Sequence, residues 1–129
     1  MDNWQQSCPA QMFCFSHPSS WQNQQASMVD STAGMLAGDN LVMRYDFGIN
    51  ADNFSRLKQA RRQSLEIDGY QAEMFIDGNL VALYIGKVHY VDVMQTHMAL
   101  SMSLEFSAQV NLELAEKVFN SVHFNPQNS

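Results

Sequence analysis

The chain has 129 residues, which suits one compact domain and leaves no room for two domains of ordinary size. Hydrophobic residues make up 46% of the sequence, enough for a buried core, so a globally disordered chain is excluded. Thirteen Asp and Glu residues outweigh seven Lys and Arg, and the net charge of −6 makes nucleic acid an unsuitable partner, because non-specific binding depends on cations at the phosphates.

Both ends of the chain are expected to be flexible, over residues 1–11 and 125–129, around a single domain at residues 12–124. The N-terminal part has neither the basic residues nor the apolar segment of a signal peptide. The longest unbroken apolar run, Leu80–Ile85, is far shorter than the roughly twenty residues that a membrane-spanning helix needs. We therefore expect neither a signal peptide nor a membrane span in this chain.

The sequence contains two cysteines, Cys8 and Cys14, with five residues between them. This spacing allows a small disulfide loop and equally allows two free thiols, because spacing alone does not fix the geometry of the Cβ atoms. A disulfide belongs to an oxidising compartment, so it would indicate a periplasmic or secreted protein. Two free thiols would suit the alternative, a cytoplasmic protein.

Apolar residues alternate with polar ones along several segments, which is the pattern of half-buried strands. The clearest case is residues 96–106, where every second residue is apolar. Asp-Gly pairs at residues 68–69 and 77–78, together with Gly38–Asn40, favour tight turns between strands. The predicted strands cover residues 28–37, 41–47, 62–67, 70–76, 80–91 and 96–106.

Residues 108–122 have apolar side chains at spacings of three and four, which predicts a long C-terminal helix with Ser107 as its N-cap. Weaker patterns indicate a turn or short helix at residues 18–25 and a short helix at residues 50–59. Consecutive strands joined by short turns favour an antiparallel sheet over a doubly wound parallel one. We therefore expect an α+β fold, in which an antiparallel sheet of about six strands is flanked by helices.

Three segments resemble the PsbP-like superfamily. Residues 13–21, which read Phe-Cys-Phe-Ser-His-Pro-Ser-Ser-Trp, resemble the F-x-F-x-x-P-x-x-W opening of these domains. Residues 68–72, Asp-Gly-Tyr-Gln-Ala, resemble their D-G-x-x-A turn. Residues 115–124, Ala-Glu-Lys-Val-Phe-Asn-Ser-Val-His-Phe, are similar to a closing helix of the form A-x-x-I-x-x-S-I-x-F.

The resemblance spans residues 13–124. It implies an α/β/α sandwich around an antiparallel sheet, and a role in binding or assembly rather than catalysis. Members of the superfamily include extrinsic subunits of photosystem II, a nuclear-transport factor that binds a small GTPase, and bacterial lipoproteins and exported proteins. The pair Cys8 and Cys14 and the low lysine content depart from the family pattern.

Four of the seven basic residues lie in one stretch of this acidic chain: Arg56, Lys58, Arg61 and Arg62. One interpretation is a docking patch for an anionic partner, ligand or lipid head group. The other is a solvated loop or helix end, balanced by the carboxylates of Asp52, Glu66 and Asp68. The sequence leaves both interpretations open.

The residue types of acid–base and metal chemistry are sparse. His89, Asp92 and His97 are close in sequence, but a catalytic metal needs a full set of protein ligands, and a surface loop explains them equally. A Cys14–His17 pair would need an environment that stabilises the thiolate. The sequence contains no G-x-S-x-G, P-loop or dinucleotide-binding motif. We assign no catalytic residue, metal or cofactor.

These observations predict a non-enzymatic binding or assembly domain that engages a protein partner in the bacterial envelope or outside the cell. One alternative is a small-molecule-binding domain with a pocket between sheet and helix. A less favoured alternative is a metal-dependent hydrolase that uses His89, Asp92 and His97. Only 16% of the residues are charged, which also makes a homo-oligomer compatible with the sequence.

Overall fold

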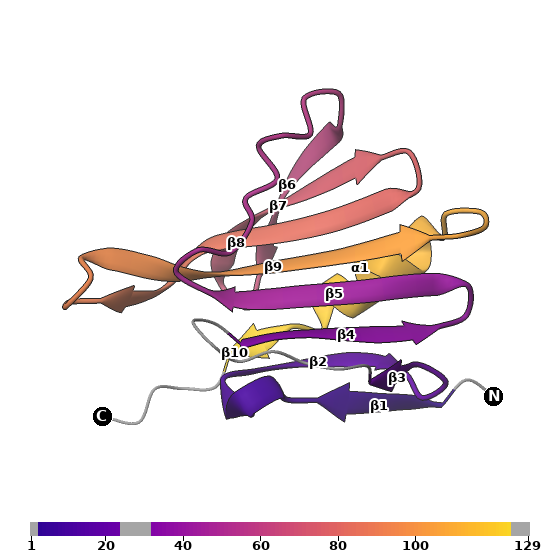
Figure 1. The fold of residues 1–129 in the computed structure, drawn as a ribbon, viewed down its shortest axis with the longest axis horizontal. Coiled ribbons are helices and arrows are strands. Elements are labelled where there is room, and N and C mark those ends of the chain that lie inside the picture. Colours follow the sequence, from indigo (N-terminus) through magenta and orange to yellow (C-terminus); the bar gives the residue numbers. More distant parts are fainter. Residues whose placement is uncertain (1–2, 24–31, 125–129) are drawn as a thin grey trace.

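The computed structural model describes residues 3–23 and 32–124, and 59% of these residues lie in strands and 11% in helical elements. In this part of the chain the strands form two antiparallel sheets, and one α-helix lies against the larger sheet (Figure 1). The elements are β1 (Trp4–Ser7), the 3₁₀ turn η1 (Pro9–Gln11), β2 (Phe13–Pro18), β3 (Gln22–Asn23), β4 (Thr32–Gly38), β5 (Leu41–Gly48), β6 (Arg61–Ile67), β7 (Tyr70–Asp77), β8 (Leu80–Val91), β9 (Thr96–Phe106), α1 (Leu112–Asn120) and β10 (His123–Phe124).

The larger sheet has seven strands in the order β3-β4-β5-β9-β8-β7-β6, and the predicted antiparallel sheet is confirmed. Its hairpin turns lie where the sequence predicts them. Residues with positive φ occupy these turns: Asp39, Asn40, Asp68, Gly69 and Gly78. Such residues match the right-handed twist of the flanking strands, so the turns set the register of the hairpins.

The predicted fold class is wrong, because the structure is mostly β and the sheet is not sandwiched between helices. The long helix expected at residues 108–122 is reduced to α1. Both the backbone N–H and the hydroxyl of Ser107 donate to the carbonyl oxygen of Asn40, each at 2.9 Å, which holds this residue against the β4–β5 turn. Asn111 caps the helix instead, since its side-chain oxygen accepts a hydrogen bond of 3.0 Å from the backbone N–H of Leu114.

Of the turn or short helix predicted at residues 18–25, the structure has the turn, and β3 follows it and pairs with β4. Residues 24–25 lie outside the described residues. The same holds for the beginning of the predicted strand 28–37. Residues 28–31 lie outside the described residues, and β4 is described from Thr32 onwards.

The short helix predicted at residues 50–59 is a loop. The Asp52 carboxylate accepts a hydrogen bond of 2.9 Å from the backbone N–H of Phe54, and the Asn53 side chain accepts one of 3.0 Å from Ser55. These local bonds offer the backbone an alternative to helical hydrogen bonds, which explains why this segment forms a loop.

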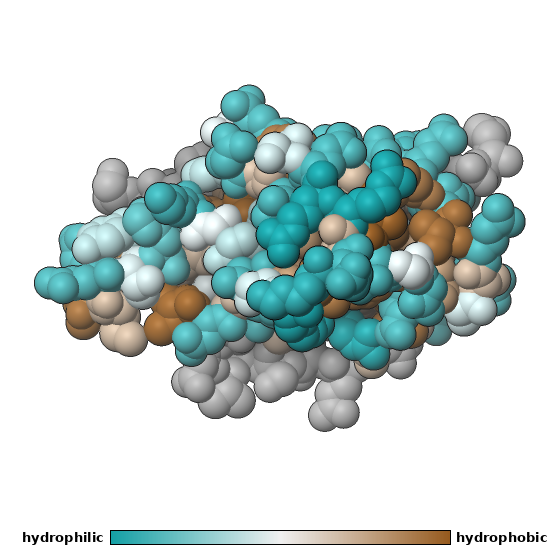
Figure 2. All heavy atoms as spheres, turned by 90° about the horizontal axis from the view of Figure 1, so that it is seen from above, coloured by the Kyte–Doolittle hydropathy of each residue, from teal (hydrophilic) through white to brown (hydrophobic). Residues whose placement is uncertain are grey.

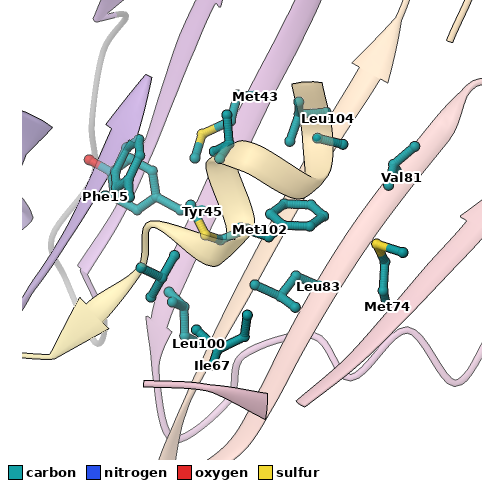
Figure 3. Packing of buried hydrophobic residues seen from close by; sticks show 14 of the residues in the cluster. Phe15, Met43, Tyr45, Ile67, Met74, Val81, Leu83, Leu100, Met102 and Leu104 are labelled. Atoms are coloured by element: carbon teal, nitrogen blue, oxygen red, sulfur yellow. The ribbon is translucent and has the colours of Figure 1, made fainter. Parts of the chain in front are cut away.

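The main core lies between α1 and one face of the larger sheet, which we call the inner face (Figure 3). The helix contributes Ala115, Val118 and Phe119, all fully buried. The sheet contributes apolar side chains from β5, β7, β8 and β9: Met43, Met74, Val81, Leu83, Leu100, Met102 and Leu104. These buried side chains fill the interface between sheet and helix.

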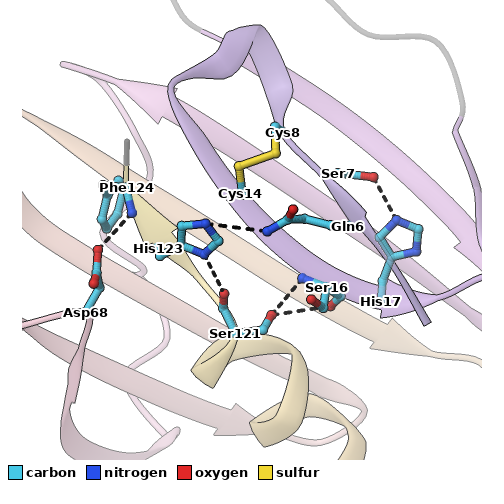
Figure 4. Close-up of a disulfide and its surroundings, with 10 residues drawn as sticks. All are labelled: Gln6, Ser7, Cys8, Cys14, Ser16, His17, Asp68, Ser121, His123 and Phe124. Carbon is cyan, nitrogen blue, oxygen red and sulfur yellow. Dashed lines mark hydrogen bonds between the residues drawn. A yellow bond between two sulfur atoms is a disulfide. The ribbon is translucent and has the colours of Figure 1, made fainter. Parts of the chain in front are cut away.

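The smaller sheet has the order β1-β2-β10 and packs beside α1. Its central strand directs Phe13 and Phe15 at Tyr45 of the larger sheet, with ring centroids 5.7 and 5.8 Å apart. The hydroxyl of Ser121, just after α1, accepts a hydrogen bond of 2.8 Å from the backbone N–H of Ser16 in β2 (Figure 4). These contacts join the smaller sheet to the helix and to the larger sheet.

Cys8 and Cys14 are joined by a disulfide, which links the start of η1 to β2 (Figure 4). The segment 1–11, for which we expect a flexible end, contains β1 and η1 in its described part. Residues 1–2 and the expected flexible end at residues 125–129 lie outside the described residues.

Candidate functional site

β6 is an edge of the larger sheet, since only β7 pairs with it in the described residues. The residues Arg61–Ser64 of this strand are exposed, and Ile67 at its other end is buried. Figure 2 looks onto this side of the molecule and shows strongly hydrophilic side chains over its centre. An edge strand presents backbone N–H and C=O groups that no neighbouring strand uses, so a further strand can add there.

Arg61 and Arg62 point to opposite faces of the sheet, because adjacent residues of a strand alternate. Arg62 is in register with Phe75, and Arg61 is in register with Ile76. Ile76 is paired in turn with Val81, which is buried on the inner face. The edge is therefore flanked by a guanidinium group on each face.

On the outer face, the face opposite α1, two arginines lie over a pair of aromatic rings. The rings of Phe54 and Phe75 have centroids 5.6 Å apart and are only 4% and 1% exposed. The guanidinium carbon of Arg56 lies 5.6 Å from the Phe54 centroid, and that of Arg62 lies 5.2 Å from the Phe75 centroid. Cation–π contact and packing of the arginine stems thus bring these two cations of the basic stretch together.

The charges of the basic stretch are only partly balanced. Arg56 forms an ion pair with Asp52, four residues earlier. Lys58, Arg61 and Arg62 are exposed and have no carboxylate within ion-pair distance in the described part of the chain. Balance by a neighbouring carboxylate therefore applies to one of the four cations, and the other three have no ion-pair partner in the described part of the chain.

The two other carboxylates that could balance the stretch do not pair with it. The Asp68 carboxylate lies in the turn beyond β6 and accepts a hydrogen bond of 2.8 Å from the backbone N–H of Phe124 (Figure 4). Glu66 lies at the far end of β6 and forms no ion pair among the described residues. The positive charge is therefore concentrated at the beginning of β6. We call Lys58, Arg61 and Arg62, together with β6, the basic edge.

Elsewhere on the outer face, one further arginine is paired with a carboxylate. Arg44 of β5 forms an ion pair of 3.3 Å with Glu105 of β9. Beside it, a hollow of about 430 Å³ lies between the strands β4, β5 and β9 and the loop that follows β5. Asp46 lines this hollow, and its buried Oδ1 has no hydrogen-bond partner among the described residues. Both arginines that line the hollow, Arg44 and Arg56, are in ion pairs, so the hollow adds no free cation to the basic edge.

The residues considered for a metal site do not converge. His89 is in register with Met98, whereas His97 is in register with Tyr90, so the two histidines lie on opposite faces of the β8–β9 hairpin. Asp92 lies in the turn of that hairpin. Within residues 3–23 and 32–124, no group of three potential metal ligands is present.

The other residues with reactive side chains have structural contacts. The disulfide leaves Cys14 without a thiol. His17 is buried, its Nδ1 donates to the Pro18 carbonyl oxygen at 2.9 Å, and its Nε2 lies 2.8 Å from the Ser7 hydroxyl (Figure 4). Burial raises the pKa of Tyr45 above its usual value, so its phenol stays neutral at physiological pH.

A larger hollow, of about 710 Å³, was not anticipated from the sequence. It lies at the N-terminal end of α1 rather than between the helix and the sheet. Its walls come from the start of β1, the β2–β3 turn, the β4–β5 turn and the segment between β9 and α1. These segments are far apart in the sequence, and no local motif marks them.

Comparison with known proteins gives no match: no family model, no curated protein and no solved structure is similar enough to this chain to be reported as a relative. Among the described residues, no helix has the length and apolar character needed to cross a membrane. The chain's function is therefore argued from its own surface.

Proposed function

We propose that this protein is a non-enzymatic binding domain that captures an acidic, extended segment of a protein partner at the basic edge. The observation that carries the proposal is the coincidence of a free sheet edge with three cations that have no ion-pair partner among the described residues. The PsbP-like pattern in the sequence supports the same class of role, because that resemblance implies binding or assembly.

An acidic strand fits this edge for two reasons. Its backbone can hydrogen-bond to the open side of β6, which is the usual mode by which a sheet edge binds an extended peptide. Its side chains would alternate between the two faces of the sheet, where Arg61 and Arg62 also alternate. Carboxylates at successive positions would thus meet a guanidinium on either face.

The net charge of −6 does not prevent this binding, because charges separated by more than about 8 Å are largely screened at physiological salt. An acidic segment would therefore be attracted mainly by the cations of the basic edge and repelled weakly by distant carboxylates. The binding should weaken as salt concentration rises.

We further propose that the protein works in an oxidising compartment, the periplasm or the cell exterior. The Cys8–Cys14 disulfide supports this location, because disulfides persist where thiols are not kept reduced. Thiol titration of protein isolated from its native source tests it, and two reactive thiols in the folded protein would contradict it.

Fluorescence anisotropy with labelled peptides tests the proposed binding. The first probe alternates pairs of Glu with pairs of Thr over eight residues, so that an added strand carries carboxylates on both faces, and the second alternates pairs of Lys with pairs of Thr. We expect the acidic probe alone to bind, and Arg61→Glu to weaken its binding by about tenfold or more, because a contact within the interface reverses sign.

Lys117→Glu is the matched control, because Lys117 is exposed on α1, lies over the Trp4 ring of the smaller sheet, and its reversal changes the net charge by the same amount. It should change the affinity by less than about twofold. Equal binding of both peptides, or equal loss in the two variants, would show that the attraction is not located at the basic edge and would contradict the proposal.

A further inference from the structure

The hollow at the N-terminal end of α1 is lined by the start of β1, the β2–β3 turn, the β4–β5 turn and the segment between β9 and α1. These segments lie on the right in Figure 1. Its volume of about 710 Å³ is within the range of known ligand sites, which span roughly 300–1,000 Å³. No residue of β6 lines it. A ligand bound here would therefore be separate from a partner at the basic edge.

Hydrogen bonds fix the walls of the hollow on the side of the smaller sheet. The backbone N–H of Ser19 donates to the carbonyl oxygen of Asn3 at 2.8 Å, which joins the β2–β3 turn to the start of β1. Oδ2 of Asp39 accepts hydrogen bonds from the Ser20 hydroxyl at 2.7 Å and from the Trp21 indole at 3.0 Å. The carboxylate is therefore held in one orientation.

The opposite wall is fixed in the same way. Ser107 holds the β4–β5 turn through two hydrogen bonds to the carbonyl oxygen of Asn40. The side-chain amide of Asn79 donates to the carbonyl oxygen of Phe106 at 2.8 Å. Because these bonds are formed in the protein itself, a ligand would not have to order the walls when it binds.

The lining of the hollow combines neutral hydrogen-bonding side chains with an apolar wall. The neutral polar side chains are Asn3, Ser19, Ser20, Asn40, Gln109 and Asn111. The apolar wall includes Trp4, Phe106 and Leu114, and the only charged residue among the described lining residues is Asp39. An anionic ligand would meet a carboxylate and no lining cation, whereas a neutral ligand with many hydroxyl groups would find both donors and acceptors.

Two of these side chains have hydrogen-bonding groups left over for a ligand. Among the described residues, both hydrogen bonds to the Asp39 side chain reach Oδ2, which leaves Oδ1 as an acceptor for hydroxyl groups. Asn111 uses its side-chain oxygen to cap α1, so its Nδ2 remains a donor. A pair of neighbouring hydroxyl groups, each of which both donates and accepts, complements such a set.

We propose that this hollow binds a neutral saccharide. One apolar face of a sugar ring would pack on the indole of Trp4, on the side opposite the Lys117 ammonium, which lies 4.3 Å from the ring centroid. The hydroxyl groups of the sugar would hydrogen-bond to Asp39, Asn40 and Asn111. The ligand class follows from the combination of an aromatic wall, amide side chains and a single fixed carboxylate. A neutral peptide is the competing occupant, and the test separates the two.

Tryptophan fluorescence reports directly on the hollow, because the chain has two tryptophans and Trp21 is only 2% exposed. The probes are maltotriose, cellotriose, chitotriose and xylotriose, with the tripeptide Gly-Ser-Gly as the competing class. We expect at least one trisaccharide to change the fluorescence saturably at millimolar concentration. Trp4→Phe should abolish the fluorescence change, since it removes the reporter that lines the site.

Calorimetry then measures the affinity of the trisaccharide that binds. Asn40→Gly, which removes an amide while keeping the positive φ of 64°, should weaken binding by about tenfold. Gln63→Gly is its control for loss of an exposed amide side chain away from the hollow, and it should leave the affinity unchanged. Binding of none of the four trisaccharides, tighter binding of the tripeptide, or indifference to Asn40→Gly would overturn the proposal. None of these outcomes bears on peptide binding at the basic edge.

Discussion

The two edges of the larger sheet are protected in different ways. β3, at one edge, is described over two residues, and the turn before it is packed against the smaller sheet. Trp21 lies buried there, stacked on His17 at 5.8 Å between ring centroids. β6, at the other edge, has seven residues, most of them exposed.

The difference indicates which of the two edges can bind a partner strand. Natural sheets avoid uncontrolled strand addition either by shortening and covering an edge or by placing charges on it. The β3 edge is flanked, in its described part, by a buried aromatic side chain, so it contributes to stability. The β6 edge is protected by its positive charge. This charge repels positively charged segments and attracts negatively charged ones.

The largest expected effect on stability is at the β3 edge. Trp21→Ala should lower the free energy of unfolding by about 3–5 kcal/mol, because it removes a large buried side chain and leaves a cavity. Trp21→Phe keeps an aromatic ring but loses the hydrogen bond to Asp39, and should cost about 1 kcal/mol beyond the loss of ring volume. Urea denaturation measures both. A loss below about 1 kcal/mol for the alanine variant would show that this edge is not held by its buried tryptophan.

A smaller effect on stability is expected from the disulfide between Cys8 and Cys14 in the smaller sheet. The double variant Cys8→Ser and Cys14→Ser should lower the free energy of unfolding by about 2 kcal/mol, because the disulfide closes a short loop and restricts the unfolded chain. Urea denaturation of the variant, compared with the reduced and the oxidised wild type, measures the change. The reduced wild type should match the variant, and a variant as stable as the oxidised protein would refute the expectation.

The smallest effect on stability is expected at the basic edge. Arg62→Ala should cost less than about 1 kcal/mol, because it removes an exposed cation–π contact with Phe75. Arg61→Ala should cost nothing measurable, since no aromatic ring or ion pair involving Arg61 is found among the described residues. Thermal denaturation compares the two variants. A loss above about 2 kcal/mol in either would mean that the edge is part of the stabilising core rather than a binding surface.

Local signals made the larger sheet predictable from the sequence. The turns at Asp39-Asn40 and Asp68-Gly69 and the alternation over residues 96–106 each act over a few neighbouring residues. The helix start was not predictable, because the hydroxyl of Ser107 bonds to Asn40, which is 67 positions away in the sequence. A contact of that range overrides a local capping preference.

The candidate sites differ in the same way: the residues of one are neighbours in the sequence, and those of the other are not. The sequence identified the basic stretch, since its residues are neighbours, but not the two buried phenylalanines that hold Arg56 and Arg62 on one face. It gave no signal of the hollow at α1, whose lining extends from Asn3 to Leu114. Only tertiary folding brings such residues together.

Hydrogen exchange of the β6 amides, with and without the Glu-Thr peptide, tests the central claim most directly. Strand addition should slow exchange at alternate residues of β6, because an added strand pairs with every second backbone N–H of an edge. The same amides should stay fast when the Lys-Thr peptide replaces the acidic one. Uniform protection across the molecule, or protection confined to other strands, would contradict the account.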